Sequence, residues 1–157
     1  MTTMQHIAGI DGYLRNSAPA FSLYGATGLL KAGAADTNGG LSLIEITVPP
    51  HFRALPPHWH ARITEGFYIL EGTLAFTIAD QTFTVMRGGF VLAPPRTVHQ
   101  FWNPTAAPAT LLNLYTPAQP EAYFADLSTL LTQPGFDLAR LLAFGEQYDQ
   151  FAPPVIP

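Results

Sequence analysis

Three histidines and one glutamate near the middle of the chain have the types and spacing of a metal-binding set. His58 and His60 stand two residues apart in PPHWHARITEG, and alternate residues of a strand share a face, so both imidazoles should point the same way. Glu65 follows five residues later, and a turn at 61–64 would bring its carboxylate back opposite them on the next strand. His99 lies in a later strand, after the proline turn of PPRTVHQFW.

Such a set offers nitrogen and oxygen donors to a single cation. If the four side chains converge inside a barrel, they suit one divalent transition metal of the first row. The sequence leaves iron, nickel, manganese, cobalt, copper and zinc open, because sites of this kind follow one affinity order and the cell decides by supply. Four ligands leave two octahedral positions for a substrate or O2. Glu65, the one carboxylate at this centre, is also the predicted general base.

Short strands are the elements expected to position these residues. The 15 prolines and 13 glycines interrupt the whole chain, which helix interiors would not tolerate. Runs of β-branched and aromatic residues between the interruptions predict an all-β sandwich or barrel. The expected strands are 41–48, 66–71, 74–79, 82–86 (a hairpin around Asp80–Gln81), 90–93, 98–102 and 110–116, with a weak one at 21–24. Apolar residues at helical spacing predict helices over 120–131 and 137–148.

The segment from about residue 40 to 116 resembles the cupin superfamily through two motifs. The first family motif is G, five residues, H-x-H, three or four residues, E, six residues, G. The second is G, five residues, P-x-G, two residues, H, three residues, N. The residues that fit them are His58, His60, Glu65 and Gly72, then Gly88, Pro94, His99 and Asn103.

Two glycines of the family pattern are replaced in this chain. Phe52 stands at the opening glycine of the first motif, and Arg96 at the inner glycine of the second. A side chain at positive φ costs roughly 1 kcal/mol or more, so the turn around Arg96 is expected to be adjusted. Neither replacement removes a predicted ligand.

The resemblance implies a cupin double-stranded β-helix, a jelly-roll barrel, with a short C-terminal helical tail. It divides the chain into an N-terminal arm (1–40), a barrel core (41–117) and C-terminal helices (118–157). The chain looks most like small bacterial single-domain cupins, some of them quercetin 2,3-dioxygenase-like, which implies oxidative ring cleavage by O2. Such cupins are typically homodimers, and residues 13–32 are the expected crossing segment.

Strand alternation also predicts the surroundings of the metal. Counting from Glu65 places Phe67 and Ile69 on the metal side, and counting from His99 places Phe101 and Asn103 there. Phe76 is expected to join them from the neighbouring hairpin. Walls of this kind favour an apolar or aromatic small-molecule substrate with the metal as its polar anchor, although any small barrel fills its interior with such side chains.

Three functions are compatible with this pattern. The first is a metal-dependent dioxygenase of a quercetin-like or other enolisable aromatic compound. The second is a metal-dependent isomerase, lyase or epimerase of a small keto or sugar compound, which needs more polar groups in the pocket. The third is a non-enzymatic protein that binds a small molecule in its barrel.

Charge and composition exclude several partners. With seven Lys and Arg against eleven Asp and Glu, the net charge is −4, so no basic face is available for nucleic acid or an anionic membrane surface. No apolar run approaches the roughly 20 residues of a membrane span. The absence of cysteine excludes disulfides and thiolate ligands. The first residues lack the features of a signal peptide, and a cytoplasmic location is the default expectation.

Overall fold

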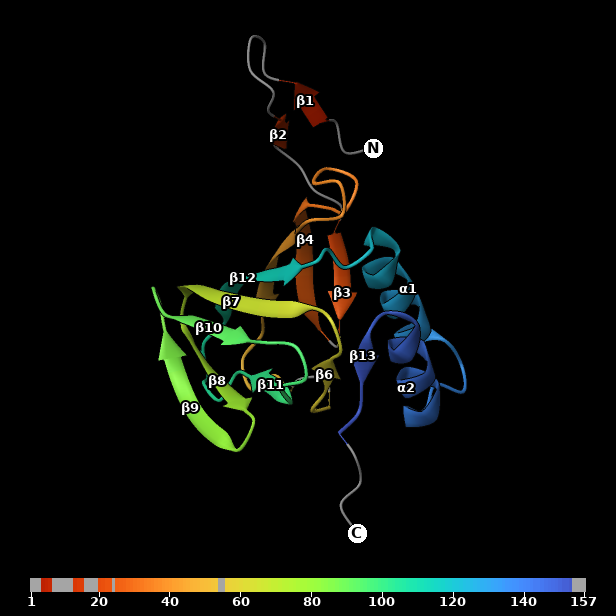
Figure 1. The fold of residues 1–157 in the computed structure, drawn as a ribbon. Helices are drawn as coiled ribbons and strands as arrows, with labels where there is room; N and C mark the ends of the chain where they lie inside the picture. Colours follow the sequence, from red (N-terminus) through yellow and green to blue (C-terminus); the bar gives the residue numbers. More distant parts are fainter. Residues whose placement is uncertain (1–3, 7–12, 16–19, 24, 54–55, 154–157) are drawn as a thin grey trace.

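The computed structural model describes residues 4–6, 13–15, 20–23, 25–53 and 56–153. Curved β-sheets enclose one core, and two helices pack on one side (Figure 1). The elements are β1 (Met4–His6), β2 (Tyr13–Arg15), β3 (Ala20–Leu23), β4 (Ala26–Ala32), β5 (Ser42–Val48), β6 (Trp59–His60), β7 (Thr64–Glu71), β8 (Thr73–Ile78), β9 (Gln81–Met86), β10 (Phe90–Ala93), β11 (His99–Trp102), β12 (Ala109–Thr116), α1 (Glu121–Thr132), α2 (Leu138–Gln147) and β13 (Gln150–Phe151).

Antiparallel pairing organises these strands into two main sheets. The larger has the order β10-β7-β12-β5-β4-β3, and the smaller has the order β11-β8-β9. Two short pairs, β13-β6 and β1-β2, complete the pattern. Neighbours far apart in sequence, such as β7 and β12, are typical of a jelly roll. The predicted fold class, an all-β jelly roll with a C-terminal helical tail, is confirmed.

The strands predicted from residue 41 onward are present with small shifts at their ends. The hairpin turn is Ala79–Asp80 and not Asp80–Gln81, because Ile78 already pairs with Gln81. Ala79 takes the left-handed conformation there, with φ 54°. The weak strand expected at 21–24 corresponds to β3, while position 24 lies outside the described residues. Strands β1, β2, β4 and β13 were not predicted. The strand expected at His58 and His60 is present as the two-residue β6, with His58 in an isolated bridge to His99.

The core follows the alternation of the central strands. In β5 the inward residues are Ile44, Ile46 and Val48, and all three are buried. In β12 the buried positions alternate in the same way and include Leu111. Burying each such side chain stabilises the fold by roughly 1.5–3 kcal/mol. This shared core fixes the register of β5 and β12, and with them that of β7.

The two helices have different capping signals. Helix α1 begins after Pro120 and buries Tyr123, Phe124 and Leu127. Helix α2 begins after Asp137, whose carboxylate accepts a hydrogen bond from the backbone N–H of Arg140 at 2.8 Å. Helix α1 packs near β3, and α2 near β13. Within the described part of the chain, neither helix is long and apolar enough to cross a membrane.

The turn before β11 keeps a backbone conformation that usually belongs to glycine. Arg96 has φ 65°, and its N–H donates to the carbonyl of His60 at 2.6 Å. The expected adjustment of this turn is therefore not observed. The strained turn instead provides a hydrogen bond to β6, the strand that carries the predicted ligand His60.

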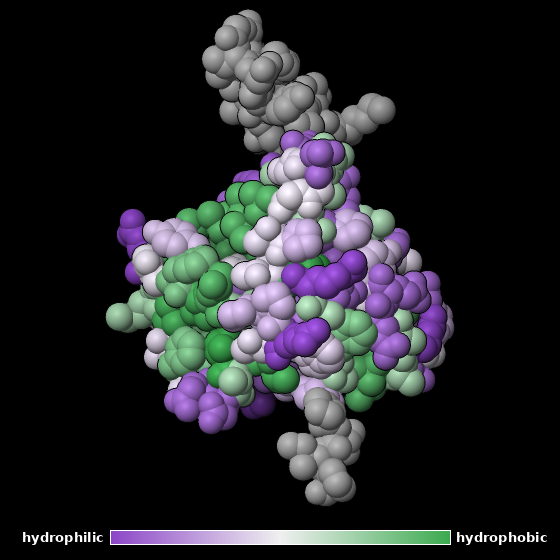
Figure 2. Space-filling model, in the orientation of Figure 1, coloured by the Kyte–Doolittle hydropathy of each residue, from purple (hydrophilic) through white to green (hydrophobic). Residues whose placement is uncertain are grey.

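Apolar side chains gather on the outer side of β9 and β10. Met86, Phe90 and Leu92 are exposed there, and Phe90 lies beside Tyr68 across the β10–β7 pair. Figure 2 shows green, apolar surface on the side of the molecule where β8, β9 and β10 lie. The homodimer, with residues 13–32 crossing to the partner, stays a prediction, and positions 16–19 and 24 of that segment lie outside the described residues.

Substituting the last glycine of the first motif should be strongly destabilising. Gly72 has φ 77°, and a Cβ would lie 2.8 Å from the carbonyl oxygen of Pro108. Gly88 has φ 86° but open space around it, so Gly88→Ala is a matched control for the backbone strain alone. We expect Gly88→Ala to lower the free energy of unfolding by about 1 kcal/mol and Gly72→Ala by a further 1–3 kcal/mol or so. Urea unfolding measures both, and equal losses would contradict the contact seen here.

Candidate metal centre

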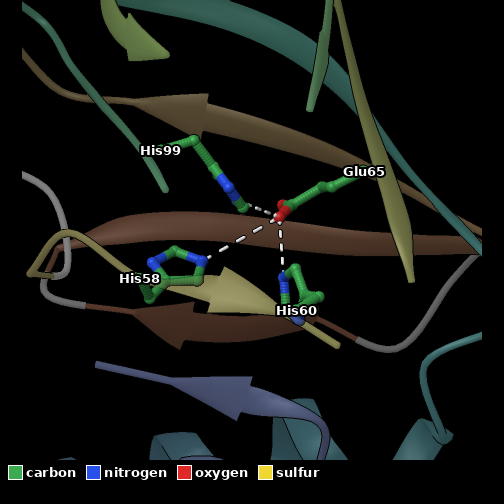
Figure 3. A group of neighbouring side chains, drawn as sticks. All are labelled: His58, His60, Glu65 and His99. Atoms are coloured by element: carbon green, nitrogen blue, oxygen red, sulfur yellow. Dashed lines mark hydrogen bonds and ion pairs between the residues drawn. The ribbon is translucent and has the colours of Figure 1, made fainter. Parts of the chain in front are cut away.

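The four predicted side chains meet at one buried point. His58 and His60 come from β6 and the residue before it, Glu65 from β7, and His99 from β11 (Figure 3). Their donor atoms all lie within 4.8 Å of one another. Glu65 Oε2 is at the centre, 2.7 Å from His99 Nε2, 3.0 Å from His60 Nε2 and 3.9 Å from His58 Nε2.

Backbone pairing holds the two histidine segments together. The N–H of His58 donates to the carbonyl of His99 at 3.1 Å, and the N–H of His99 donates back to His58 at 2.8 Å. The chain then bends over residues 61–63 before β7 begins, as the spacing predicted. Glu65 lies between Ala93 and Tyr115 in the sheet, so its side chain enters the barrel opposite the histidines.

Backbone carbonyls orient all three imidazole rings. The Nδ1 atoms of His58, His60 and His99 lie 3.1, 2.8 and 2.9 Å from the carbonyl oxygens of three residues. A carbonyl only accepts, so each Nδ1 carries a hydrogen and each Nε2 faces the centre. There the Nε2 atoms of His60 and His99 lie at hydrogen-bond distance from Glu65 Oε2, and in the neutral rings the same atoms would offer their lone pairs to a metal. These carbonyls, which the sequence could not identify, belong to Pro56, Asp149 and Thr97.

The electrostatics of the group favour a cation at its centre. Burial opposes the ionisation of Glu65, yet its interactions with the three histidines hold the pKa of this carboxyl well below its usual value. Burial also lowers the pKa of His58. For His60, burial acts in the same direction, but Glu65 outweighs it and raises the pKa. The buried carboxylate needs positive charge beside it. Protons on the imidazoles can supply that charge, and so can a divalent transition metal, which this donor set fits.

A second polar layer fixes the other oxygen of Glu65. The side-chain amide of Asn113 donates to Glu65 Oε1 at 3.0 Å and to the carbonyl of Gly66 at 3.1 Å. The hydroxyl of Tyr115 donates to Asn113 Oδ1 at 2.7 Å, and burial raises the pKa of Tyr115 so that it stays protonated. Sequence reasoning missed Asn113, although a polar residue on the apolar face of LLNLYT was the available signal.

The metal centre opens into a narrow cavity. Its free volume is about 50 Å³, which is room for a few water-sized molecules. Phe67 and Phe101, two of the predicted pocket residues, line it. The helical tail supplies walls that the sequence did not predict. They are Tyr123, Phe124 and Gln150.

The other three predicted pocket residues do not line this cavity. Ile69 and Phe76 are fully buried in the core, with Phe76 packed behind Phe67 at a ring separation of 5.2 Å. Asn103 lies past the end of β11, and its amide joins loops: Nδ2 donates to Pro49 at 3.0 Å, and Oδ1 accepts from the N–H of Thr105 at 2.9 Å. Alternation fails for Asn103 because the strand has already ended.

His51 does not belong to the group. It is exposed and has φ 54° in the loop after β5. His6 belongs to β1, and its side chain lies outside the described part of the structure. Within that part, Glu65 and the three histidines around it form the group whose geometry could hold a metal ion.

Comparison with known proteins agrees with this fold and site. Residues 44–115 match the family model described as Cupin domain. Germin-like protein 3-1 of Oryza sativa subsp. japonica is 33% identical over 130 residues, 76% of this chain and 57% of that protein. The chain thus spans a little over half the length of this curated relative.

Solved structures with the same fold include two bacterial cupins. An RmlC-like cupin from Shewanella frigidimarina has a TM-score of 0.56 at 17% identity over 64% of this chain and 85% of its own. A sugar phosphate isomerase of the cupin superfamily from Silicibacter pomeroyi has a TM-score of 0.51 at 24% identity over 59% of each chain. At these identities the likeness concerns the fold. Residues 44–115 of this protein therefore match the Cupin domain model and have the cupin fold, and the quercetin dioxygenase-like subtype stays a prediction.

Removal of one imidazole should abolish stoichiometric metal binding. We expect His99→Ala, after loading with Ni(II) or Co(II) and dialysis, to retain far less than one metal per chain, because the remaining donors no longer surround the site. His51→Ala removes an exposed histidine outside the group and should bind like the wild type. Elemental analysis measures both, and a folded His99→Ala protein with full metal content would refute the site.

Metal affinity should fall as the pH is lowered through neutrality. Because the pKa of His60 is raised above its ordinary value of 6.5, a proton begins to compete with the metal above that pH, and each displaced proton can cost up to about tenfold in affinity per pH unit. Glu65 stays ionised over this range and adds no competing proton. Titration calorimetry with Co(II) between pH 6 and 8 measures the slope, and a flat profile would count against His60 as a ligand.

Proposed function

We propose that this protein is a mononuclear metal-dependent dioxygenase acting on a compact, largely apolar substrate that can enolise. The observation that carries the proposal is the position of the donor group. His58 and Glu65 form part of the wall of a cavity whose other walls are mostly aromatic. A substrate in that cavity would be directed at the metal, and the remaining polar side chains of the lining are uncharged.

The lining of the cavity defines the substrate class. Among the described residues that form it, none is an arginine or a lysine, so a phosphate or a second carboxylate would have no cationic partner. Phe67, Phe101 and Phe124 instead offer apolar surfaces. The free volume of about 50 Å³ favours a compact compound. A three-ring flavonol such as quercetin would require the aromatic walls to move.

The residues of the chain prepare the site for an enol or enediol. A metal bound by the four donors would act as a Lewis acid toward the substrate oxygen and as the centre for O2. Glu65 would accept the enol proton at Oε2 once this oxygen loosens from the metal, while the Asn113 amide at Oε1 keeps the carboxylate oriented. The aromatic walls exclude water, which strengthens these interactions.

One polar group of the cavity is suited to orient the substrate. Gln150 Oε1 accepts a hydrogen bond from the hydroxyl of Tyr123 at 2.7 Å. This bond assigns the oxygen of the amide to Tyr123 and leaves the Nε2 hydrogens for a substrate oxygen. The substrate best suited to this arrangement has a second acceptor oxygen within reach of Gln150.

The second candidate function, an isomerase or lyase of a small keto compound, is favoured by the same carboxylate. Glu65 is the single carboxylate among the described residues that line the cavity, and Gln100 and Gln150 line the same cavity. Proton abstraction next to a carbonyl needs a base and a polarised oxygen, but no O2. Consumption of O2 therefore separates the two candidates.

The decisive experiment measures oxygen uptake by the metal-loaded protein. The protein, reconstituted separately with Fe(II), Ni(II), Co(II) and Mn(II), is given small enediols, aromatic hydroxy-ketones and quercetin. We expect uptake with at least one metal, and faster turnover of the compact aromatic compounds than of quercetin. Glu65→Gln should lower the rate by about 100-fold or more, whereas the control His51→Ala should leave it unchanged.

Two results would decide against the dioxygenase. Conversion of a keto compound without oxygen uptake would indicate the isomerase or lyase. Tight binding of a compound that is never converted, with every metal tested, would indicate a non-enzymatic binding protein.

A further inference from the structure

The residue that connects the C-terminal segment to the metal centre is Asp149. It follows α2 directly and lies 89 positions after His60 in the sequence. It is buried, with 7% of its surface exposed, and it has the left-handed φ of 62°. A buried acid in a strained conformation far from the cupin motifs requires a local explanation.

The carboxylate of Asp149 holds the turn between two of the ligands. Oδ1 accepts from the N–H of Ala61 at 3.2 Å, and Oδ2 accepts from Arg62 at 2.9 Å and Ile63 at 3.1 Å. Three successive backbone N–H groups thus surround one carboxylate, which is an anion-binding arrangement. These residues form the bend that returns the chain from β6 to Glu65, so the bend depends on a side chain from the other end of the protein.

The backbone of the same residue orients a ligand. The carbonyl oxygen of Asp149 accepts the Nδ1 hydrogen of His60 at 2.8 Å. This carbonyl can reach the imidazole because Asp149 adopts its left-handed conformation at the end of α2. One residue therefore fixes both the ring of His60 and the turn that follows it.

The residues that follow Asp149 attach the C-terminal segment to the barrel. Strand β13 pairs with β6, placing Gln150 beside His60 and Phe151 beside Trp59. The Phe151 and Trp59 rings stack at 4.8 Å, and the indole N–H of Trp59 donates to the carbonyl of Ala152 at 3.0 Å. Figure 1 shows β13 running between α2 and β6.

We propose that Asp149 is a positioning residue of the metal centre and that metal binding is coupled to the docking of the C-terminal segment, residues 148–152. The proposal rests on the metal binding that the proposed function requires, but not on the reaction. Because the coupling is reciprocal, a metal that fixes His60 stabilises the docked segment, and a docked segment raises the affinity for the metal.

Asp149→Asn separates positioning from general stability. Asparagine has the same size, tolerates positive φ and keeps the backbone carbonyl, but it loses one of the two acceptor oxygens in the turn. We expect the dissociation constant for Co(II) to rise 10- to 100-fold and the visible absorption bands of the bound Co(II) to change. The matched control is Asp137→Ala, which removes the cap of α2. It should lower the melting temperature of the metal-free protein while leaving Co(II) affinity and spectrum unchanged.

Hydrogen exchange of the wild-type protein provides a second measurement that does not depend on the variant. Addition of Co(II) should slow amide exchange in residues 148–152 as well as around the ligands. In Asp149→Asn this added protection should be smaller at equal saturation with metal.

The outcomes are distinguishable from those of the proposed function. Unchanged Co(II) affinity and spectrum in a folded Asp149→Asn protein would overturn the positioning role. Equal losses of Co(II) affinity in Asp149→Asn and Asp137→Ala would show that Asp149 has only a structural role. Amide exchange in residues 148–152 that does not change on addition of Co(II) would overturn the coupling. A wild type that binds Co(II) without oxygen uptake would contradict the dioxygenase alone, whereas a wild type that binds no metal would overturn both.

Discussion

The burial of one carboxylate among three imidazoles is the constraint on which the rest of this structure depends. Glu65 is 3% exposed, and an uncompensated charge at such a depth would be strongly destabilising. Its compensation comes from the imidazoles at Oε2 and from the Asn113 amide at Oε1. Backbone carbonyls accept from the Nδ1 atom of each ring and so turn its Nε2 atom toward the carboxylate. Each donor of the site is therefore held in place by a neighbouring group. A cation bound among these donors would balance the negative charge of the carboxylate.

The scarcity of charge in this chain makes the few buried acids informative. Only eleven Asp and Glu occur in 157 residues. Among the residues that the structure describes, Glu65 and Asp149 are the buried ones. Glu65 faces the imidazoles, whereas Asp149 faces backbone N–H groups. Glu65 follows the short turn over residues 61–63, and the carboxylate of Asp149 accepts the backbone N–H groups of that turn, so the two buried acids act on the same part of the barrel.

Local patterns predicted the strands and the convergence of the ligands because both depend on the two-residue period and on turns within a few residues. The same logic misplaced Asn103, since the alternation was continued past Trp102, where β11 ends. Ile69 and Phe76 lie in the interior, but alternation alone could not separate the core from the cavity wall. Asn113 could have been found from its apolar strand. Asp149 could not, because its partners lie about 87 positions away and depend on how the helical tail docks.

The docking of the C-terminal segment on the barrel also affects how much of the cavity the segment 44–115 forms by itself. The matched segment, residues 44–115, contains all four donors and the Asn113 amide. Tyr123, Phe124 and Gln150, which form walls of the cavity, lie outside it, and so does the carbonyl that orients His60. Proteins that share the four donors can therefore present them to different cavities, because the segment that closes the barrel supplies much of the wall. In the proposed function the barrel would supply the metal ligands, and the C-terminal segment, which forms part of the cavity wall, would contribute to the choice of substrate.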